Sequence, residues 1–533
     1  MISNILKNIR RLFTLVKFIY SSNKLYKNIK KNNLISNNLD GKKILINSVR
    51  TCNPQQITTE LYFALLLRVN GADVHILYDD NTLLMQDTNH YEESKIQKTL
   101  KIFRDKIFSI PIFFCTIFRE LKISYSSILR RSSKESLELD LNHHVYASLA
   151  RYYLSSTDET CLQEEKCYKT VKNKIELNAK ISLKTAEICN EIFKPDFILS
   201  SHGIYSTWGP FYEFFRTKNI KTICYGVNCF HPGTIDMSMN DIAATRFDSK
   251  FYDYFHSFKK ENKIESIVDD YSEKLILSRL SYEASDQKLF NHNIHKSSVD
   301  DILQKKLDKI DPDSRVIGIF PNVLWDNATT FNHLNTLFSS PVEWLIQTIS
   351  SLLNDSNTVI LRIHPAEGVA SRKVRKGVYE TIQKNLGSLI DHKNLIIIKS
   401  NDIYSSYKLF NYLDSATIYN GTIGYELLKK RVPTIVASNA PFSKCIHTPK
   451  NKKEYYDMLN NYEFTDLKFD QDKYNSLIYY YFKLHQLNFP TWKHQLFELS
   501  DELKYSDLYC REMIHFIDVL RGKNKYLQEI NLK

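Results

Sequence analysis

Polar side chains that could bind a phosphate group recur in the second half of the chain, each near the end of a stretch with the pattern of a buried strand. Arg362 and His364 lie at the end of the stretch VILRI, and both can donate hydrogen bonds to phosphate oxygens. Asn420, Gly421 and Thr422 follow the strand expected at 417–419, and a glycine loop can present backbone N–H groups to the same anion. We therefore predict an anion site assembled from several loops.

Carboxylates and amides accompany these donors. Glu426 lies about one turn into the helix expected at 425–431, where it could accept hydrogen bonds from ribose hydroxyls; an ordinary solvated glutamate is the alternative. Glu367 follows the strand 359–363, while Asn322 and Asp326 follow the strand 315–320. Parallel strands of an open α/β sheet bring their carboxyl ends to one edge. These loops are therefore expected to meet.

A histidine occupies the corresponding place in the first half of the chain. His202 follows the buried strand expected at 196–200, and in α/β sheets that end of a strand faces the ligand crevice. A purely structural histidine is the alternative. His231, in the loop after the next strand, is a second candidate of the same kind.

No metal or dinucleotide cofactor is expected. The loop between the strand at 42–47 and the helix at 58–69 lacks a GxGxxG pattern, and the nine cysteines form no CxxC pair. His143 and His144 are adjacent in a helical pattern, so they should point to different faces of the helix.

The elements that would position these residues form two series. Strands expected at 42–47, 72–78, 196–200 and 221–225 alternate with helices, and so do strands at 315–320, 359–363, 394–399, 417–419 and 432–436. This alternation predicts an α/β fold. We assign 1–40 to a basic N-terminal segment, 41–237 to an N-terminal domain with a helical insertion, 238–311 to a connection, 312–470 to a C-terminal domain and 471–533 to C-terminal helices, which include 474–487 and 503–520.

The amino-acid composition indicates which kinds of molecule the protein could bind. The formal net charge of +12 favours anionic partners such as nucleotides or phospholipid surfaces, but no nucleic-acid-binding motif accompanies it. Residues 1–31 form a basic amphipathic pattern that suits either an anionic membrane surface or packing on the domain that follows. The apolar run at 107–118 is too short to span a bilayer. We expect a cytoplasmic protein, with peripheral attachment to the inner face of the cell membrane left open.

With these motifs in view, the chain resembles bacterial capsular and surface-polysaccharide biosynthesis proteins of the glycosyltransferase-B type. The similar stretches, spread from about residue 42 to residue 520, are DFILSSHGIYSTWGPFYEFFRTKNIKTICYG, VIGIFPNVLWDNA, VILRIHPAE, YNGTIGYELLKKRVPTIVA and YNSLIYYYFKLHQLNFP. The resemblance implies two Rossmann-like domains facing each other across a cleft. It also implies a nucleotide-sugar donor bound by the C-terminal domain and a glycan or lipid-linked glycan acceptor bound by the N-terminal domain.

The resemblance also assigns roles to residues. In related transferases, a histidine of an HP motif and a hydroxyl in a later glycine loop contact the donor phosphates, which matches His364 and Thr422 here. Glu426 matches an acidic residue near the nucleotide ribose. Relatives often have a basic residue in the glycine loop, where this chain has Asn420 and Gly421. Phosphate neutralisation would then rest more heavily on His364 and Arg362.

Glycosyl transfer needs a stabilised leaving phosphate and, in an inverting enzyme, a base for the acceptor. No apolar-flanked DxD metal motif is present, and His202, Glu60 and Asp326 are equal candidates for the base. Three alternatives remain: a phosphotransferase that uses a CDP-activated alditol, a non-catalytic scaffold of polysaccharide assembly, and a nucleotide-sugar epimerase.

Overall fold

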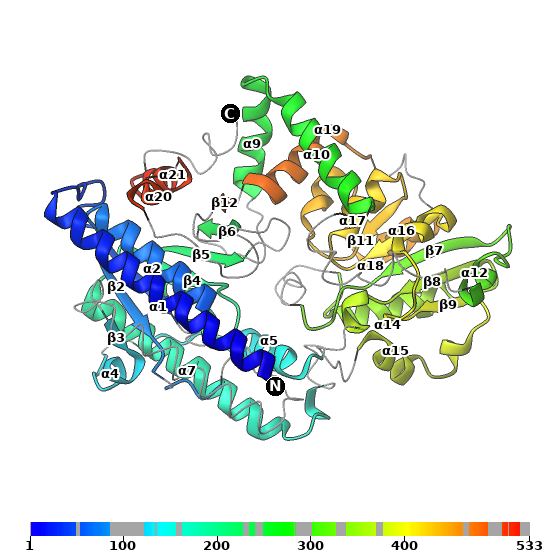
Figure 1. Cartoon of the computed structure of the whole chain (residues 1–533). Helices are drawn as coiled ribbons and strands as arrows, with labels where there is room; N and C mark the ends of the chain where they lie inside the picture. The colour runs from blue at the N-terminus through cyan, green and yellow to red at the C-terminus, as the bar shows by residue number, and fades with distance from the viewer. Residues whose placement is uncertain are drawn as a thin grey trace. The chain divides into compact units, whose positions relative to one another are not determined.

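The computed structural model describes residues 2–48, 54–80, 82–85, 122–133, 136–155, 162–227, 234–239, 249–281, 283, 301–326, 337–368, 377–461, 468–484, 486–488, 504–509 and 511–522. The chain forms two compact units (Figure 1). The first comprises Met1–Ser148, Lys169–Phe251 and Lys483–Lys533, and the second comprises Leu149–Tyr168 and Tyr252–Phe482. His231 and the apolar run at 107–118 lie outside the described residues.

The first unit is built around a mostly parallel sheet. Its strands are β1 (Lys43–Ser48), β2 (Asp73–Tyr78), β3 (Lys122–Ser124), β4 (Phe197–Ser201), β5 (Lys221–Val227), β6 (Thr234–Met239) and β12 (Gln486–Asn488). Its helices are α1 (Ile2–Lys31), α2 (Pro54–Val69), α4 (Tyr125–Leu129), α5 (Asn142–Tyr153, which continues into the second unit), α7 (Tyr168–Phe193), α8 (Gly209–Thr217), α20 (Tyr505–Leu508) and α21 (Arg511–Leu520).

The strand order of this sheet is β12-β6-β5-β4-β1-β2-β3. The strands from β3 to β5 are parallel, and β6 and β12 add an antiparallel edge. In the central register, Ile46 of β1 lies opposite Ile76 of β2 on one side and Leu199 of β4 on the other. The parallel part has the Rossmann order 3-2-1-4-5, which reverses direction between β1 and β4.

The second unit repeats this plan with a five-stranded sheet. Its strands are β7 (Arg315–Phe320), β8 (Asn357–Arg362), β9 (Leu395–Ile398), β10 (Ser415–Ile418) and β11 (Thr434–Val436). Its α-helices are α9 (Ser249–Glu261, which begins in the first unit), α10 (Glu265–Leu280), α12 (Asp301–Leu307), α14 (Pro341–Leu352), α15 (Val378–Leu386), α16 (Ser406–Leu409), α17 (Ile423–Lys429), α18 (Lys452–Asn461) and α19 (Gln471–Tyr479). Short 3-10 turns are η2 (Pro365–Gly368), η4 (Gly387–Asp391), η5 (Phe410–Tyr412) and η6 (Pro441–Cys445).

All strands of the second sheet are parallel, in the order β11-β10-β7-β8-β9. Ile319 of β7 lies between Thr417 of β10 and Leu361 of β8. This is again the order 3-2-1-4-5, with its reversal between β7 and β10. The prediction of an α/β fold with two Rossmann-like domains is therefore confirmed.

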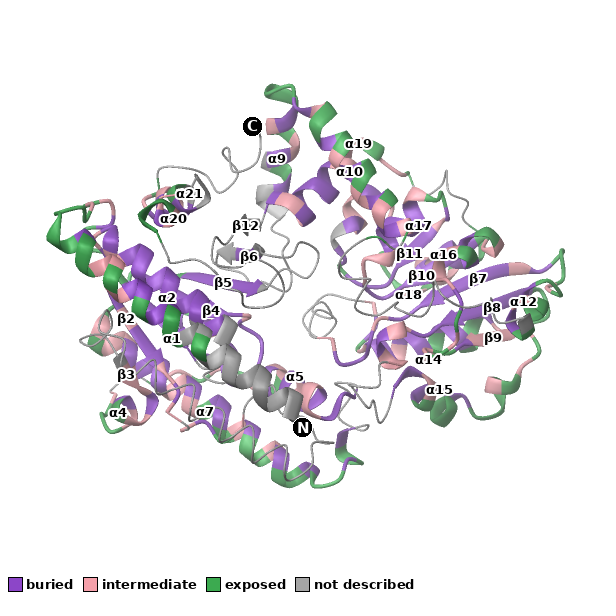
Figure 2. Cartoon of the chain, in the orientation of Figure 1, coloured by how far each residue is buried: buried purple, intermediate pink, exposed green. Residues whose placement is uncertain are grey.

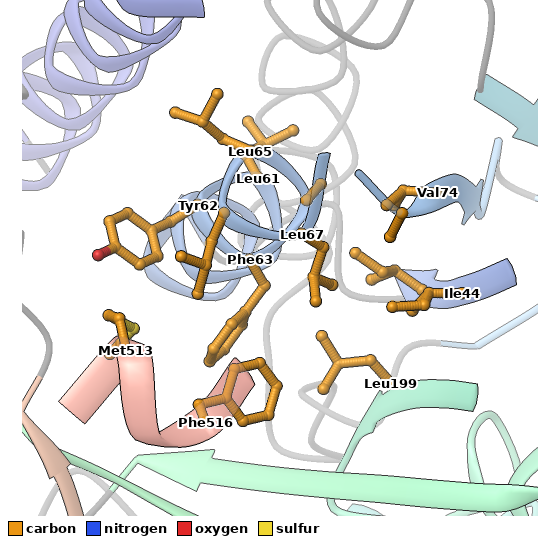
Figure 3. Packing of buried hydrophobic residues seen from close by; sticks show 14 of the residues in the cluster. Ile44, Leu61, Tyr62, Phe63, Leu65, Leu67, Val74, Leu199, Met513 and Phe516 are labelled. Carbon is orange, nitrogen blue, oxygen red and sulfur yellow. The ribbon is translucent and has the colours of Figure 1, made fainter. Parts of the chain in front are cut away.

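Burial in the first unit is concentrated around α2. Figure 3 shows this helix between the strands that carry Ile44 and Leu199 and the C-terminal helix α21, whose Phe516 faces Phe63 and whose Met513 lies on the side of Tyr62. The rings of Phe63 and Phe516 lie 5.4 Å apart. Residues more than 440 positions apart therefore share one core.

The N-terminal helix α1 packs on α2 through its second half. Phe18, Ile19 and Ile29 are buried, and the guanidinium of Arg68 lies over the ring of Tyr26. Figure 2 shows α2, on which α1 packs, coloured mostly purple as buried. This half supports the packing interpretation of the amphipathic pattern, while most side chains of residues 2–15 lie outside the described set. Among the described residues, no helix is long and apolar enough to cross a membrane.

The C-terminal segments differ from expectation. The helix expected at 474–487 ends as α19 at Tyr479, continues as a π-helical turn Tyr480–Leu484, and is followed by strand β12. Strand β12 pairs with β6, and the sequence analysis predicted neither strand. Helix α10, within the segment expected to be a connection, belongs to the second unit.

Candidate functional site

The second sheet brings three of the predicted loops to one edge. Strands β10, β7 and β8 are neighbours, and Thr422, Asn322 and His364 follow their respective carboxyl ends. The order of the sheet reverses between β7 and β10, which is where open α/β sheets bind their ligands. The polar loops predicted from the sequence therefore surround the topological switch point of this unit.

His364 is held in a defined tautomer. Its Nδ1 atom is 3.1 Å from the backbone nitrogen of Ala366, and because a backbone N–H can only donate, Nδ1 must accept. The neutral ring then carries its proton on Nε2. The short turn η2, which begins at Pro365, produces this contact directly after the strand. His364 is thus prepared to donate a hydrogen bond from Nε2.

An arginine that the sequence analysis missed reaches the glycine loop. Arg279, near the end of α10, donates from Nε to Glu426 Oε1 at 2.5 Å and from Nη2 to Thr422 Oγ1 at 3.0 Å. The side chains of Arg279 and Glu426 are only 4% and 3% exposed. A guanidinium, its charge balanced by the Glu426 carboxylate, therefore lies at the loop that lacks its own basic residue. No local sequence signal marks Arg279, because it lies more than 140 positions before the loop.

The interpretation of Glu426 changes accordingly. Its carboxylate is buried and is bound by Arg279, so the structure gives it a role in holding this guanidinium beside Thr422. Asn420 is also buried, and Gly421 has a φ of 145°, a backbone conformation that favours glycine. The space next to Gly421 where a side chain would start is open.

Arg362 does not fit the phosphate-binding role predicted for it. Its side chain is buried and donates to the carbonyls of Lys399 (2.5 Å) and Tyr404 (3.3 Å), with Ser406 Oγ at 3.4 Å. These contacts fix the loop after β9. The guanidinium of Arg362 is therefore engaged with the loop after β9, whereas that of Arg279 contacts the glycine loop through Thr422.

Glu367 is a second residue whose surroundings differ from expectation. Its Oε2 accepts from the backbone nitrogen of Val378 at 3.0 Å, while its Oε1 is closed off from solvent and has no partner among the described residues. Burial, with a contribution from nearby Glu380, raises the pKa of Glu367 to about 8. The group is thus mostly neutral at pH 7, and it joins the HPAE turn to the start of α15.

Asn322 and Asp326 bond to one another across their loop. The Nδ2 atom of Asn322 lies 2.9 Å from Asp326 Oδ2, and its Oδ1 accepts from the backbone nitrogen of Val323 at 2.8 Å. Trp325 and Val323 pack with Ala366 of the HPAE turn, so the loops after β7 and β8 support each other. This packing explains how two separate loops keep a fixed spacing.

In the first unit, His202 has an unusual backbone conformation. Its φ is +59°, in the left-handed region that residues other than glycine seldom adopt, and its ring stacks on Trp208 with centroids 5.6 Å apart. Its Nδ1 contacts Ser201 Oγ, and its backbone nitrogen donates to the carbonyl of Tyr225. The residue follows β4 at the switch point of the first sheet, as predicted.

Glu60 is poorly placed to act as a base. It is 2% exposed, and its carboxylate accepts from Tyr225 OH at 2.5 Å, from Gln56 Nε2 at 3.0 Å and from Ser48 Oγ. These bonds join α2 to strands β1 and β5. We therefore interpret Glu60 as a structural residue that holds α2 against the sheet of the first unit.

The expectation that His143 and His144 diverge is wrong. Their rings lie 3.8 Å apart, and both Nε2 atoms approach Oε2 of Glu213, at 3.3 Å and 2.8 Å. Both histidines lie in the first turn of α5. Although they are adjacent in the sequence, both imidazole rings reach the same carboxylate oxygen. Burial alone would raise the pKa of Glu213, but the contacts of its carboxylate with the two histidines outweigh burial and hold that pKa well below its ordinary value.

Comparison with known proteins adds the following. No protein-family model and no curated protein matches the chain. Among solved structures, a β-Kdo 2,7-transferase, KpsC, from Thermosulfurimonas dismutans is 11% identical, with 55% of this chain and 79% of that chain covered and a TM-score of 0.31.

Two further solved structures illustrate the range. A UDP-GlcNAc 2-epimerase from Neisseria meningitidis, bound to UDP-GlcNAc, is 11% identical over 82% of this chain and 97% of that chain, with a TM-score of 0.23. The wall teichoic acid polymerase TagF is 11% identical over 90% of this chain and 92% of that chain, with a TM-score of 0.22. These are proteins to which the chain is similar, and at such scores they do not identify its reaction.

Proposed function

We propose that the protein is a glycosyltransferase that transfers a sugar from a nucleotide-activated donor to a growing capsular or cell-surface polysaccharide. The observation that carries the proposal is the edge of the second sheet at the β7/β10 reversal, where His364, Thr422 and Arg279 come from three separate parts of the chain. Donors of hydrogen bonds and positive charge gathered at a switch point suit a phosphate-bearing ligand.

The proposed chemistry follows from what these groups can do. A bond forms between an acceptor hydroxyl oxygen and the anomeric carbon, while the bond from that carbon to the donor phosphate oxygen breaks. Negative charge then grows on the leaving phosphate. The Nε2–H of His364, the hydroxyl of Thr422 and the guanidinium of Arg279 are the groups that would stabilise it.

The acceptor hydroxyl must lose a proton, and His202 is our candidate for the group that takes it. Imidazole is the side chain most often used to accept a proton near neutral pH. Its left-handed backbone and its stacking on Trp208 fix the ring firmly. Glu60 is no longer favoured because its carboxylate is already bonded, and Asp326 is bonded to Asn322.

The donor site is tested by His364→Ala, with His392→Ala as a matched control. The Nδ1 of His392 also contacts a backbone nitrogen two residues on, that of Asn394, but His392 precedes β9 and so lies at the opposite end of the strands. Losing a charge-assisted phosphate contact should cost about 1.5–3 kcal/mol, a fall in kcat/KM of roughly tenfold to more than a hundredfold. The control should retain wild-type kcat/KM.

The reaction is measured by incubating the full-length protein with a panel of nucleotide sugars and following release of the nucleotide. Thermal stabilisation by UDP, CDP and CMP identifies the nucleotide. Equal activity of His364→Ala and wild type would contradict the assignment of the donor site. Transfer of an alditol phosphate from a CDP-activated donor, with no sugar transferred, would replace the proposed reaction by the phosphotransferase alternative.

A further inference from the structure

The cluster of His143, His144 and Glu213 belongs to the first unit, whereas the loops of the donor site belong to the second. Each residue offers one ligand atom, and these atoms all lie within 4.8 Å of one another. Among the described residues, no other group of three histidine, cysteine or carboxylate side chains meets this condition. The proposed reaction makes no use of it.

Both ring nitrogens of His144 face oxygen atoms that can only accept hydrogen bonds, although a neutral imidazole carries a single N–H. Its Nδ1 contacts the carbonyl oxygen of Ile204, which can only accept, so Nδ1 must carry the proton. In the neutral ring, Nε2 then presents a lone pair to Glu213 Oε2, an acceptor only 2.8 Å away. Two acceptors at this distance need a proton or a metal cation between them.

The distances favour a metal ion. Two ligand atoms that lie about 2.0–2.1 Å from a tetrahedral zinc ion are about 3.3 Å apart. The Nε2 atom of His143 is 3.3 Å from Glu213 Oε2, and that of His144 is 2.8 Å from it. The first distance already matches this spacing, the second needs a small opening, and all the ligand atoms lie within 4.8 Å of one another.

The surroundings of the cluster resemble those of metal-binding histidines. Ligand histidines usually donate their other ring N–H to a carbonyl or carboxylate, as His144 does to Ile204. Gly209 makes room for this ring, since a Cβ atom there would lie 2.0 Å from His144 Nδ1. Whereas His144 is 2% exposed, the side chains of His143 and Glu213 are 31% and 33% exposed, which gives solvent access to one side.

We propose that His143, His144 and Glu213 form a binding site for a divalent transition metal such as Zn²⁺, with at least one coordination position open to solvent. Two imidazoles and one carboxylate are a ligand set that suits Zn²⁺, and three protein ligands are typical of sites that keep an exchangeable position. A metal bound there would connect the start of α5, which carries the two histidines, to α8, which carries Glu213. His144 also contacts Ile204, in the loop that follows His202.

The test uses the full-length protein after treatment with a chelator and dialysis. Zn²⁺ binding is measured by titration calorimetry, and the visible absorption of bound Co²⁺ reports the coordination geometry. The variants are Glu213→Gln and His143→Gln, both at partly exposed positions, with folding checked by circular dichroism. His447→Gln is the matched control, because His447 also contacts a carboxylate, Glu454 at 2.9 Å, but belongs to no cluster of three possible ligands within the part of the chain that the structure describes.

We expect wild type and His447→Gln to bind one equivalent of Zn²⁺ that both cluster variants bind at least about tenfold more weakly. The tetrahedral Co²⁺ spectrum should disappear in the same two variants. If the wild type binds no Zn²⁺, a proton occupies the gap and the proposal is wrong. Equal stoichiometry and affinity in wild type and in a folded Glu213→Gln protein would also overturn it.

Discussion

Replacing Glu367 by glutamine should stabilise the protein, and the gain should grow with pH. The pKa of this carboxyl is raised from 4.5 to about 8 because burial disfavours its charge, and Glu380 adds to the effect. Glutamine imitates the neutral form and can still accept from the backbone nitrogen of Val378. Glu367→Gln therefore removes the cost of ionising a buried group while keeping its one hydrogen bond.

The size of the effect follows from proton linkage. Between pH 4.5 and pH 8 the folded chain holds a proton on Glu367 that the unfolded chain has released, so this group lowers the free energy of unfolding as the pH rises. At about 1.36 kcal/mol per pH unit, the whole window amounts to about 5 kcal/mol. The advantage of Glu367→Gln should be near zero at pH 4.5, about 3 kcal/mol at pH 7 and nearly complete at pH 8.5.

The assay is urea unfolding followed by tryptophan fluorescence at pH 5, 7 and 8.5, with the variant compared with wild type at each pH. Glu343→Gln provides a control of opposite sign. Partial burial alone would raise the pKa of Glu343, but hydrogen bonds from Lys452 and Ser339 lower it to about 2. Its variant should lose stability above pH 4.5 and recover as the pH falls toward 2. A stability difference for Glu367→Gln that does not change with pH would refute the reasoning.

Three further predictions concern other parts of the chain. Arg279→Ala should lower the free energy of unfolding by about 3–5 kcal/mol because it leaves Glu426 buried without its partner, whereas the double change Arg279→Met with Glu426→Leu should recover most of the loss in urea unfolding. Gly209→Ala should cost about 1–3 kcal/mol because its Cβ would overlap the ring of His144, and an unchanged melting temperature would contradict this packing. Deleting residues 2–12 should release the protein from anionic vesicles at low salt, where charges act beyond about 10 Å; continued binding would exclude this segment as the anchor.

The sequence predicted the sheets well because their signals are local. Buried strands such as β7, which matches the predicted 315–320, are short apolar runs bounded by turn residues, and a parallel sheet buries both faces of each strand. The alternation of these runs with helices was enough to predict the α/β class. His202, His364 and Thr422 could be singled out as candidates because each lies in the loop after such a run.

Long-range partners were not predictable in this way. Arg362 and Arg279 have the same chemistry, and only the folded chain shows that one is bonded to backbone carbonyls while the other reaches Thr422. The meeting of His143 and His144 depends on Glu213, nearly 70 residues later. Strand β12 was missed because its three residues continue an aromatic helical pattern, and its pairing with β6 decides its structure.

The return of the chain to the first unit has a consequence for biosynthesis. Strand β12 supplies the last strand at the β6 edge, and α20 and α21 close the surface of α2, where Tyr62 donates to the carbonyl of Asp507 across 445 positions. A ribosome must therefore deliver nearly the whole polypeptide before this unit can be completed. The interrupting second unit, whose sheet is contained within residues 315–436, can assemble earlier, although it is encoded later than most of the first. A premature stop codon that falls after β11 and before β12 would thus release a chain with a finished second sheet and an unfinished first one, with the apolar side of α2 exposed to chaperones and proteases.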